Sequence, residues 1–221
     1  MYKNFLKRGI DFIICLIALP FFLLIYIFLA VAIKLDDGGP IFFIDKRIGK
    51  DSKIFNMYKF RSMKVNAPDI RNSDGSTFNG KDDPRLTRLG RFIRETSIDE
   101  TSQILNVLKG DMSIIGPRAS MESALESYRN DEMDKMKVRP GISGYTQAYY
   151  RNNLSVRDKR LKDAWYANNV SFMLDIKIFF KTIMTVIKRE SIYTDNSKIS
   201  SNDITIKEID NKITDTKRIK V

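Results

Sequence analysis

An uncharged, strongly apolar run over residues 12–33 constrains this chain more than any other feature of its sequence. The run, FIICLIALPFFLLIYIFLAVAI, is about 22 residues long, which is the length a helix needs to cross the hydrocarbon core of a bilayer. A secretory signal peptide has a shorter apolar core and a small-residue cleavage site, whereas this run leads into KLDDGGP. The sequence therefore predicts a membrane-embedded helix near the N-terminus.

The residues alone leave two arrangements of that helix open. In the first, the helix spans the bilayer with its N-terminus in the cytoplasm. The strongly basic remainder of the chain would then lie outside, against the tendency of Lys and Arg to stay on the cytoplasmic side. In the second, Pro20 removes a helical hydrogen bond and bends the axis, so that the helix dips into one leaflet and returns on the same side.

Composition limits the chemistry that the rest of the chain can perform. The 221 residues contain no histidine and a single cysteine, Cys15, which excludes a disulfide framework, a Cys-rich metal site and any Ser-His or Cys-His nucleophile. In an enzyme built from this chain, carboxylates, lysines, arginines and tyrosines would carry the chemistry, and any metal would have oxygen ligands, which points to magnesium or manganese. The net charge of +11 indicates an anionic partner: nucleic acid, anionic lipid or a phosphorylated substrate.

Periodicity predicts a small hairpin followed by helices. Residues 41–49 and 53–63 are rich in β-branched and aromatic side chains and flank a polar turn, which is typical of paired strands. A short basic amphipathic segment lies over residues 85–94, helices are predicted over residues 98–109, 121–137 and 171–190, and a polar loop is predicted over residues 66–83. The segment 171–190 alternates apolar and basic residues, so it suits either the plane of an anionic membrane surface or a core contact with a solvated basic face.

Asp99 and Glu100 stand side by side where the segment 98–109 begins. Ser97, Ile98, Asp99 and Glu100 match the S-x-x-E capping box, and this local pattern alone favours a structural interpretation. The surrounding cations favour a functional one, because guanidinium groups beside paired carboxylates can hold phosphates and a divalent ion. No glycine-rich G-x-x-x-x-G-K-[ST] loop is present, which excludes a P-loop NTPase.

Several longer motifs carry a family resemblance. Four motifs occur in the order found in bacterial sugar transferases that initiate glycoconjugate assembly. They are the basic start with its apolar run, then MYKFRSM, then RLTRLGRFIRETSIDETSQILNVLKGDMSIIGPR, and then VRPGISGYTQ. Over nearly the whole chain, residues 2–189, the sequence is similar in particular to the small monotopic polyprenyl-phosphate phosphoglycosyl transferases.

The resemblance implies a reaction and a site. Such enzymes transfer a sugar-1-phosphate from a UDP-sugar to undecaprenyl phosphate and release UMP, with Mg²⁺. Their Asp-Glu pair matches Asp99, the nucleophile that forms a covalent phosphosugar intermediate, and Glu100, which with Asp99 holds the metal. The candidates for binding phosphate and nucleotide are Lys59, Arg61, Arg85, Arg118 and Arg151.

The resemblance also implies an architecture. We expect an α+β, mostly helical fold: a re-entrant membrane helix over residues 1–36, then a compact catalytic domain over residues 37–190 with a small β-hairpin and amphipathic interfacial helices, then a polar, disordered tail over residues 191–221. The expected location is the bacterial inner membrane, with the catalytic domain on the cytoplasmic face. Membrane lipid is an expected partner, nucleic acid is not, and a homo-oligomer stays open.

Two other functions remain as alternatives. A lipid-independent phosphatase or nucleotidyltransferase would use the same acids and metal but would not depend on polyprenyl phosphate. A non-catalytic, basic membrane-surface protein would tolerate loss of Asp99, and its binding would instead depend on Lys, Arg and salt.

Overall fold

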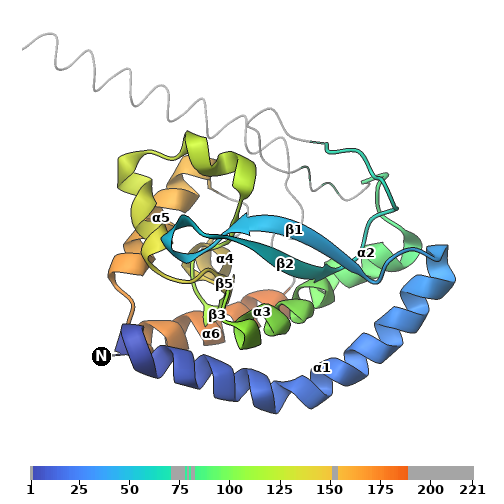
Figure 1. Ribbon diagram of the computed structural model, residues 1–221, viewed down its shortest axis with the longest axis horizontal. Helices are drawn as coiled ribbons and strands as arrows, with labels where there is room; N and C mark the ends of the chain where they lie inside the picture. The colour runs from blue at the N-terminus through green and yellow to red at the C-terminus, as the bar shows by residue number, and fades with distance from the viewer. Residues whose placement is uncertain (1, 71–77, 79, 81–82, 151–153, 189–221) are drawn as a thin grey trace, which may run out of the picture.

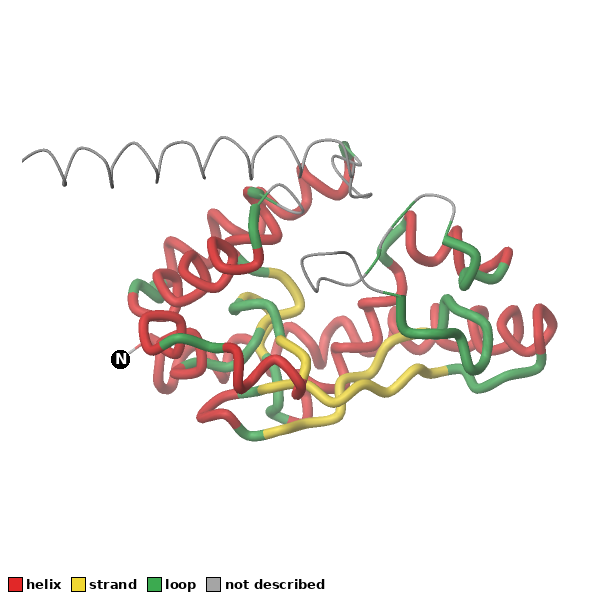
Figure 2. Tube along the Cα trace, turned by 90° about the horizontal axis from the view of Figure 1, so that it is seen from above, coloured by secondary structure: helices red, strands yellow, loops and turns green. Residues whose placement is uncertain are grey.

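The computed structural model describes residues 2–70, 78, 80, 83–150 and 154–188. The described chain is mostly helical with two small sheets, which confirms the expected α+β class; helices account for most of the trace in Figure 2 and strands for a narrow part. The expected tail over residues 191–221 lies outside the described residues, and so does most of the loop over residues 66–83.

The N-terminal helix α1, Lys7–Asp37, follows a short π-helical segment, η1, Tyr2–Leu6. It is continuous through Pro20, and Figure 1 shows it bending along its length beneath the rest of the molecule. Gly38, with φ 71°, ends it in the left-handed conformation. By length and composition α1 could cross a membrane, and only 17% of its most apolar 18-residue window is buried in the protein. Most of its apolar surface therefore faces outward.

The predicted hairpin is confirmed. Strand β1, Phe42–Ile48, pairs antiparallel with β2, Ile54–Phe60, and the short β4, Ser120–Met121, joins the other edge of β1. The turn between the two long strands contains η2, Lys50–Ser52. Aromatic rings fix the hairpin on α1, since Tyr26 stacks on Phe42 at 5.6 Å between ring centroids.

The remaining elements follow the hairpin in chain order. They are α2 (Arg88–Glu95), η3 (Ile98–Gln103), α3 (Ile104–Lys109), β3 (Ser113–Ile115), η4 (Glu122–Ser127), η5 (Asn130–Lys137), β5 (Gly141–Ser143), α4 (Tyr145–Tyr149), α5 (Val156–Asn168) and α6 (Phe172–Ile187). Strands β3 and β5 pair in parallel as a separate two-stranded sheet. The prediction of one helix over residues 121–137 is wrong, because the chain forms two 3₁₀ segments there, with extended backbone at Tyr128 between them.

The larger core joins the membrane-length helix to the part of the chain that carries the acid pair. Cys15, Phe22, Leu29 and Ile33 of α1 pack with buried residues of β2, α2 and α3. A smaller core lies around Ile115, Ala148, Tyr166 and Ile178. Because α1 contributes to the larger core over most of its length, it packs closely against the elements that follow it.

Helix α6 confirms the helix predicted within residues 171–190 and its contact with the core, while a contact with the membrane surface stays a prediction. Ile178 is fully buried on the side that packs against the domain. Phe172, Met173, Phe179, Phe180 and Met184 are each 45–61% exposed. This helix therefore has a core contact on one side and presents an exposed apolar surface on another.

Candidate active site

The acid pair lies on the 3₁₀ segment η3, between α2 and α3. Ser97, just before it, has φ 57° and ψ 21°, in the left-handed region that non-glycine residues rarely adopt, and its hydroxyl makes no capping hydrogen bond. The predicted capping box is therefore wrong: the Glu100 carboxylate is bonded to Lys59. The left-handed Ser97 turns the chain sharply at the entry to η3, and such strained residues gather at functional sites.

Strand β2 fixes the position of η3 through polar contacts. The Ser102 hydroxyl donates to the Tyr58 carbonyl at 3.1 Å, and the buried Asn106 side chain accepts from the Tyr58 N–H at 3.0 Å and donates to the Asn56 carbonyl at 2.7 Å. These bonds hold the acid pair beside Lys59, the next residue of the strand. Lys59 Nζ lies 3.0 Å from Glu100 Oε1 and 3.9 Å from Asp99 Oδ2.

The two carboxylates experience different electrostatic environments. Burial raises the pKa of Asp99 from its ordinary 3.8 to about 6, against the positive charge of Lys59. Burial also disfavours the charged form of Glu100, but Lys59 and Arg118 outweigh it and lower the pKa of that carboxyl. At neutral pH the site therefore holds two ionised carboxylates, of which Asp99 is the more basic.

Arg118 approaches the pair from the loop after β3. Its guanidinium lies 3.9 Å from Glu100 Oε1 and its side chain is 56% exposed, so it faces both the site and solvent. Its backbone is held by the buried Asp163 and Lys135: Asp163 Oδ2 accepts from the Arg118 N–H at 3.3 Å, and Lys135 Nζ donates to the Arg118 carbonyl at 3.0 Å. The backbone of Arg118 is thus held by buried groups while its guanidinium is exposed to solvent.

Two further arginines act on the acid pair, and neither was among the predicted site residues. Burial raises the pKa of Asp99, and the charge of Arg94 at the end of α2 offsets part of that rise; Arg47 on β1 adds to the lowering of the Glu100 pKa by Lys59 and Arg118. The buried Nε of Arg47 is without a hydrogen-bond partner among the described residues. Its placement depends on the pairing of β1 with β4, a long-range contact that local sequence patterns do not reveal.

Two of the predicted phosphate ligands are bonded to other carboxylates. Arg61 pairs with Asp37 at the end of α1, and Arg85 pairs with the fully buried Asp83 at 2.7 Å. Of the predicted cations, the structure thus brings Lys59 and Arg118 to the acid pair. Binding of phosphate by Arg61 and Arg85 stays a prediction, and Arg151 lies outside the described residues.

The donor chemistry of the acid pair fits Mg²⁺. This ion takes oxygen ligands, and proteins commonly supply one or two carboxylates while water and substrate phosphates complete the coordination. Asp99 and Glu100 meet that requirement, although the described residues contain no group of three or more Asp, Glu, Cys or His side chains placed to hold a metal alone.

Comparisons with known proteins show the family to which this chain belongs. The sequence model of the family described as "Bacterial sugar transferase" matches residues 2–189. The UDP-N-acetylgalactosamine-undecaprenyl-phosphate N-acetylgalactosaminephosphotransferase of Aeromonas hydrophila is 41% identical over 189 residues, covering 83% of this chain and 44% of that protein. The undecaprenyl-phosphate galactose phosphotransferase of Salmonella typhimurium is 39% identical over 206 residues, covering 86% and 42%.

A shorter relative matches over almost its full length. The "Uncharacterized sugar transferase EpsL" of Bacillus subtilis is 40% identical over 191 residues, covering 86% of this chain and 92% of that protein. The chain therefore spans less than half the length of the first two relatives and nearly all of the third. A family match over residues 2–189, which include the acid pair and its cations, shows that this chain belongs to the bacterial sugar transferase family.

Proposed function

We propose that this protein is a phosphoglycosyl transferase that moves a sugar-1-phosphate from a UDP-sugar to undecaprenyl phosphate and releases UMP. The observation that carries the proposal is the adjacent pair Asp99 and Glu100, held beside Lys59 and Arg118 in a chain of this family. Relatives named as undecaprenyl-phosphate sugar phosphotransferases support the acceptor and the transferred group.

In the first step an Asp99 carboxylate oxygen attacks the phosphorus that bears the sugar. A bond forms between that oxygen and phosphorus, the bond from phosphorus to the UMP oxygen breaks, and UMP leaves with the electron pair. Asp99 needs no general base because it is already ionised, which fits a chain without histidine. Its raised pKa supports this role, since a more basic carboxylate is a better nucleophile.

In the second step a phosphate oxygen of undecaprenyl phosphate attacks the same phosphorus. The bond from phosphorus to Asp99 breaks, the free carboxylate is restored, and the product is a polyprenyl diphosphosugar. Lys59 and Arg118 would bind the phosphate oxygens in both steps and reduce the repulsion between anionic reactants. The exposed tip of Arg118 suits this role, because it can follow a phosphate that enters or leaves.

Mg²⁺ would be held by Glu100 together with Asp99. When bound, the ion would offset the negative charge of the diphosphate and of departing UMP. Lys59, which bonds Glu100 in this structure, would then have an ammonium group free to bind a phosphate oxygen.

The membrane arrangement that we propose is a re-entrant α1 on the cytoplasmic face of the bacterial inner membrane. Both ends of α1 are bonded to the same domain: Arg8 near its start donates to the Leu108 carbonyl at 3.1 Å, and Asp37 at its end pairs with Arg61. A helix that crossed the bilayer would place its ends on opposite sides. One face of α1 is apolar and points outward, and the opposite face packs in the domain core. The helix can therefore lie in one leaflet, where the site would reach the lipid phosphate.

The experiment that tests the function is UMP release from a panel of UDP-sugars by the detergent-solubilised protein with Mg²⁺, with and without undecaprenyl phosphate. Lipid-dependent release with one donor is expected and would identify the sugar. Release that is independent of the lipid and leaves free sugar phosphate would contradict the transferase and indicate the hydrolytic alternative.

Variants of the acid pair test the mechanism in the same assay. Asp99→Asn should lower turnover at least about a thousandfold and Glu100→Gln about a hundredfold, because they remove the nucleophile and a metal ligand. Glu126→Gln, an exposed change on η4, is the matched control and should be neutral. Full activity of Asp99→Asn would refute the covalent intermediate.

A further inference from the structure

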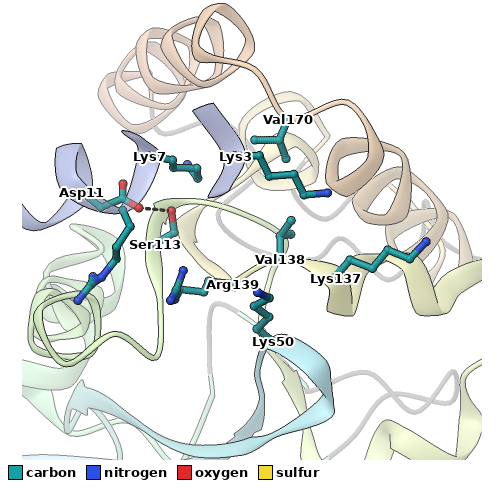
Figure 3. Close-up of a pocket in the computed structure, with 10 residues that line it drawn as sticks. Lys3, Lys7, Asp11, Lys50, Ser113, Lys137, Val138, Arg139 and Val170 are labelled. Carbon is teal, nitrogen blue, oxygen red and sulfur yellow. Dashed lines mark hydrogen bonds between the residues drawn. The ribbon is translucent and has the colours of Figure 1, made fainter. Parts of the chain in front are cut away.

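A second cluster of cations lies at the beginning of α1, apart from the acid pair. It lines a cavity of about 170 Å³ together with Asp11, Ser113, Val138 and Val170. Figure 3 shows lining side chains that come from the N-terminal helix, the hairpin turn and the segment 137–139, with the Lys137 side chain pointing outward. The cations are Lys3, Lys7, Arg8, Lys50, Lys137 and Arg139.

Three of these cations are bonded to neutral groups. Lys3 donates to the Ala167 carbonyl at 2.8 Å, Arg8 to the Leu108 carbonyl at 3.1 Å, and Arg139 to the Gly110 carbonyl at 2.8 Å. These carbonyls hold the side chains in place but do not neutralise their charge. Backbone bonds thus fix three positive charges around one small space.

The acidic groups nearby do not balance that charge. Lys7, Lys50 and Lys137 are each paired with a carboxylate, of Asp175, Asp51 and Asp134 respectively. Among the described residues that line the cavity, Asp11 is the single carboxylate, and it accepts a hydrogen bond of 2.6 Å from the Ser113 hydroxyl (Figure 3). The three carbonyl-bonded cations exceed this one acid, so the cavity carries a net positive charge that suits an anion.

Exposed apolar side chains stand next to the cations. Phe5, between Lys3 and Lys7 in the chain, is 77% exposed, and Phe172 and Met173, which follow Val170, are 50% and 59% exposed. The Tyr2 ring contacts Phe172 edge-on at 5.7 Å between centroids, which joins the two apolar segments. A cationic cavity bordered by an apolar surface matches a phosphate headgroup with attached acyl chains, whereas a free phosphate would make no use of that surface.

We propose that this cavity binds the phosphate of one anionic glycerophospholipid molecule. The phosphate lies among the carbonyl-bonded cations Lys3, Arg8 and Arg139, and the acyl chains run along Phe5 and Phe172. The site sits where α1 begins its apolar run, so a bound lipid fixes the depth of that end of the helix in the membrane. Its role is separate from the transfer reaction, and no residue of the acid-pair site takes part.

The test is titration of the full chain, purified in an uncharged detergent, with phosphatidylglycerol, with bound lipid counted by native mass spectrometry. Lys3→Gln/Arg139→Gln removes two carbonyl-bonded charges. Lys50→Gln/Lys137→Gln removes two ammonium groups whose side chains are 46% and 60% exposed, so it carries little risk to folding. Lys46→Gln/Lys64→Gln, at exposed positions outside the cavity, is the charge-matched control.

We expect one phosphatidylglycerol per chain, with affinity about tenfold weaker in both cavity variants and within about twofold of wild type in the control. Phosphatidylcholine should bind at least about tenfold more weakly, and excess inorganic phosphate should not displace the lipid. Equal weakening in the control, unchanged affinity in both cavity variants, or displacement of the lipid by the excess of inorganic phosphate would each overturn the proposal.

Discussion

At the scale of single residues, Asp99 shows how burial serves reactivity at a cost in stability. The residue is 9% exposed, and burial raises the pKa of its carboxyl to about 6 although Lys59 lies nearby. Above that pH the folded protein holds a charge that water would solvate better, which lowers the free energy of unfolding. The same poor solvation leaves the carboxylate oxygen more available to attack phosphorus.

Asp99→Asn should therefore stabilise the metal-free protein while removing its activity. A raised folded-state pKa means that the folded chain binds the proton more tightly, so the cost of ionisation is absent below the ordinary value of 3.8, grows between 3.8 and about 6, and is complete above. At about 1.4 kcal/mol per pH unit the full cost is on the order of 3 kcal/mol. Thermal unfolding in EDTA should show a Tm gain of several degrees at pH 8 and a smaller gain at pH 5.

Asp131→Asn is the control variant for this thermal unfolding experiment. Asp131 is exposed and pairs with Arg157 at 2.8 Å, and exposed ion pairs contribute little to stability. Its removal should change Tm slightly or not at all at both pH values. A gain for Asp99→Asn that was equal at pH 5 and pH 8 would contradict the assignment of the gain to ionisation.

The sequence motifs were enough to predict that Lys59 and Arg118 belong to the site of the acid pair, because the motifs of the family contain all of these groups. They did not separate the arginines near the acids from those bonded elsewhere. Arg61 and Arg85 lie in equally cationic stretches of the sequence. In the structure, however, Arg61 forms an ion pair with Asp37, and Arg85 forms one with Asp83, two residues before it in the chain. Tertiary packing decides which carboxylate pairs with a given guanidinium, and local sequence patterns do not reveal that packing.

At the scale of elements, α2 is positioned by a close backbone contact. A Cβ built on Gly90 would lie 1.8 Å from the Ser62 carbonyl oxygen, so glycine alone lets the helix approach the chain that follows β2. Thr87 caps the helix by accepting from the Gly90 N–H at 2.9 Å. Arg94 lies on this same helix, 3.5 Å from Asp83, and its charge offsets part of the rise in the Asp99 pKa that burial causes.

Gly90→Ala should displace α2 and weaken the fold by about 1–3 kcal/mol, the usual cost of forcing extra volume into a packed site. Lower Tm of the purified protein is the direct measurement. Gly9→Ala in α1 is the matched control, because a Cβ there has nothing within 4 Å and alanine is the better helix former. Equal Tm values for the two variants would show that the Ser62 contact does not limit this position.

Elements with a strong local pattern were predictable, and those defined by distant contacts were not. The hairpin, α6 and the apolar helix follow from alternation or apolar periodicity. The segment 121–137 has helical composition, but Glu132 is buried under Arg157 and Arg160 of α5, and the Tyr128 ring packs on Arg160 at 4.1 Å. These tertiary contacts replace one helix by two 3₁₀ segments, and the β3–β5 pair depends on a similar long-range approach.

At the scale of the whole molecule, the length of α1 and the contacts at its two ends limit how the chain could meet a membrane. Its 31 residues correspond to about 46 Å of helix, longer than the hydrocarbon core is thick, yet both ends bond to one domain. The buried side chains Cys15, Phe22, Leu29 and Ile33 keep the helix on that domain between the two ends. A crossing orientation would require these contacts to break or the polar domain to enter the bilayer.

Single cysteines introduced at the two ends of α1, in a Cys15→Ser variant, should therefore be accessible to a labelling reagent from the same side of the membrane. Lys3→Cys and Asp36→Cys flank α1, and the exposed Glu126→Cys marks the side of the catalytic domain. A membrane-impermeant maleimide should modify all three in inverted inner-membrane vesicles and none in intact spheroplasts, because a re-entrant helix returns both ends to the cytoplasm. Labelling of Lys3→Cys in spheroplasts, with Asp36→Cys and Glu126→Cys labelled in inverted vesicles, would instead mean that α1 spans the bilayer and leaves the domain core.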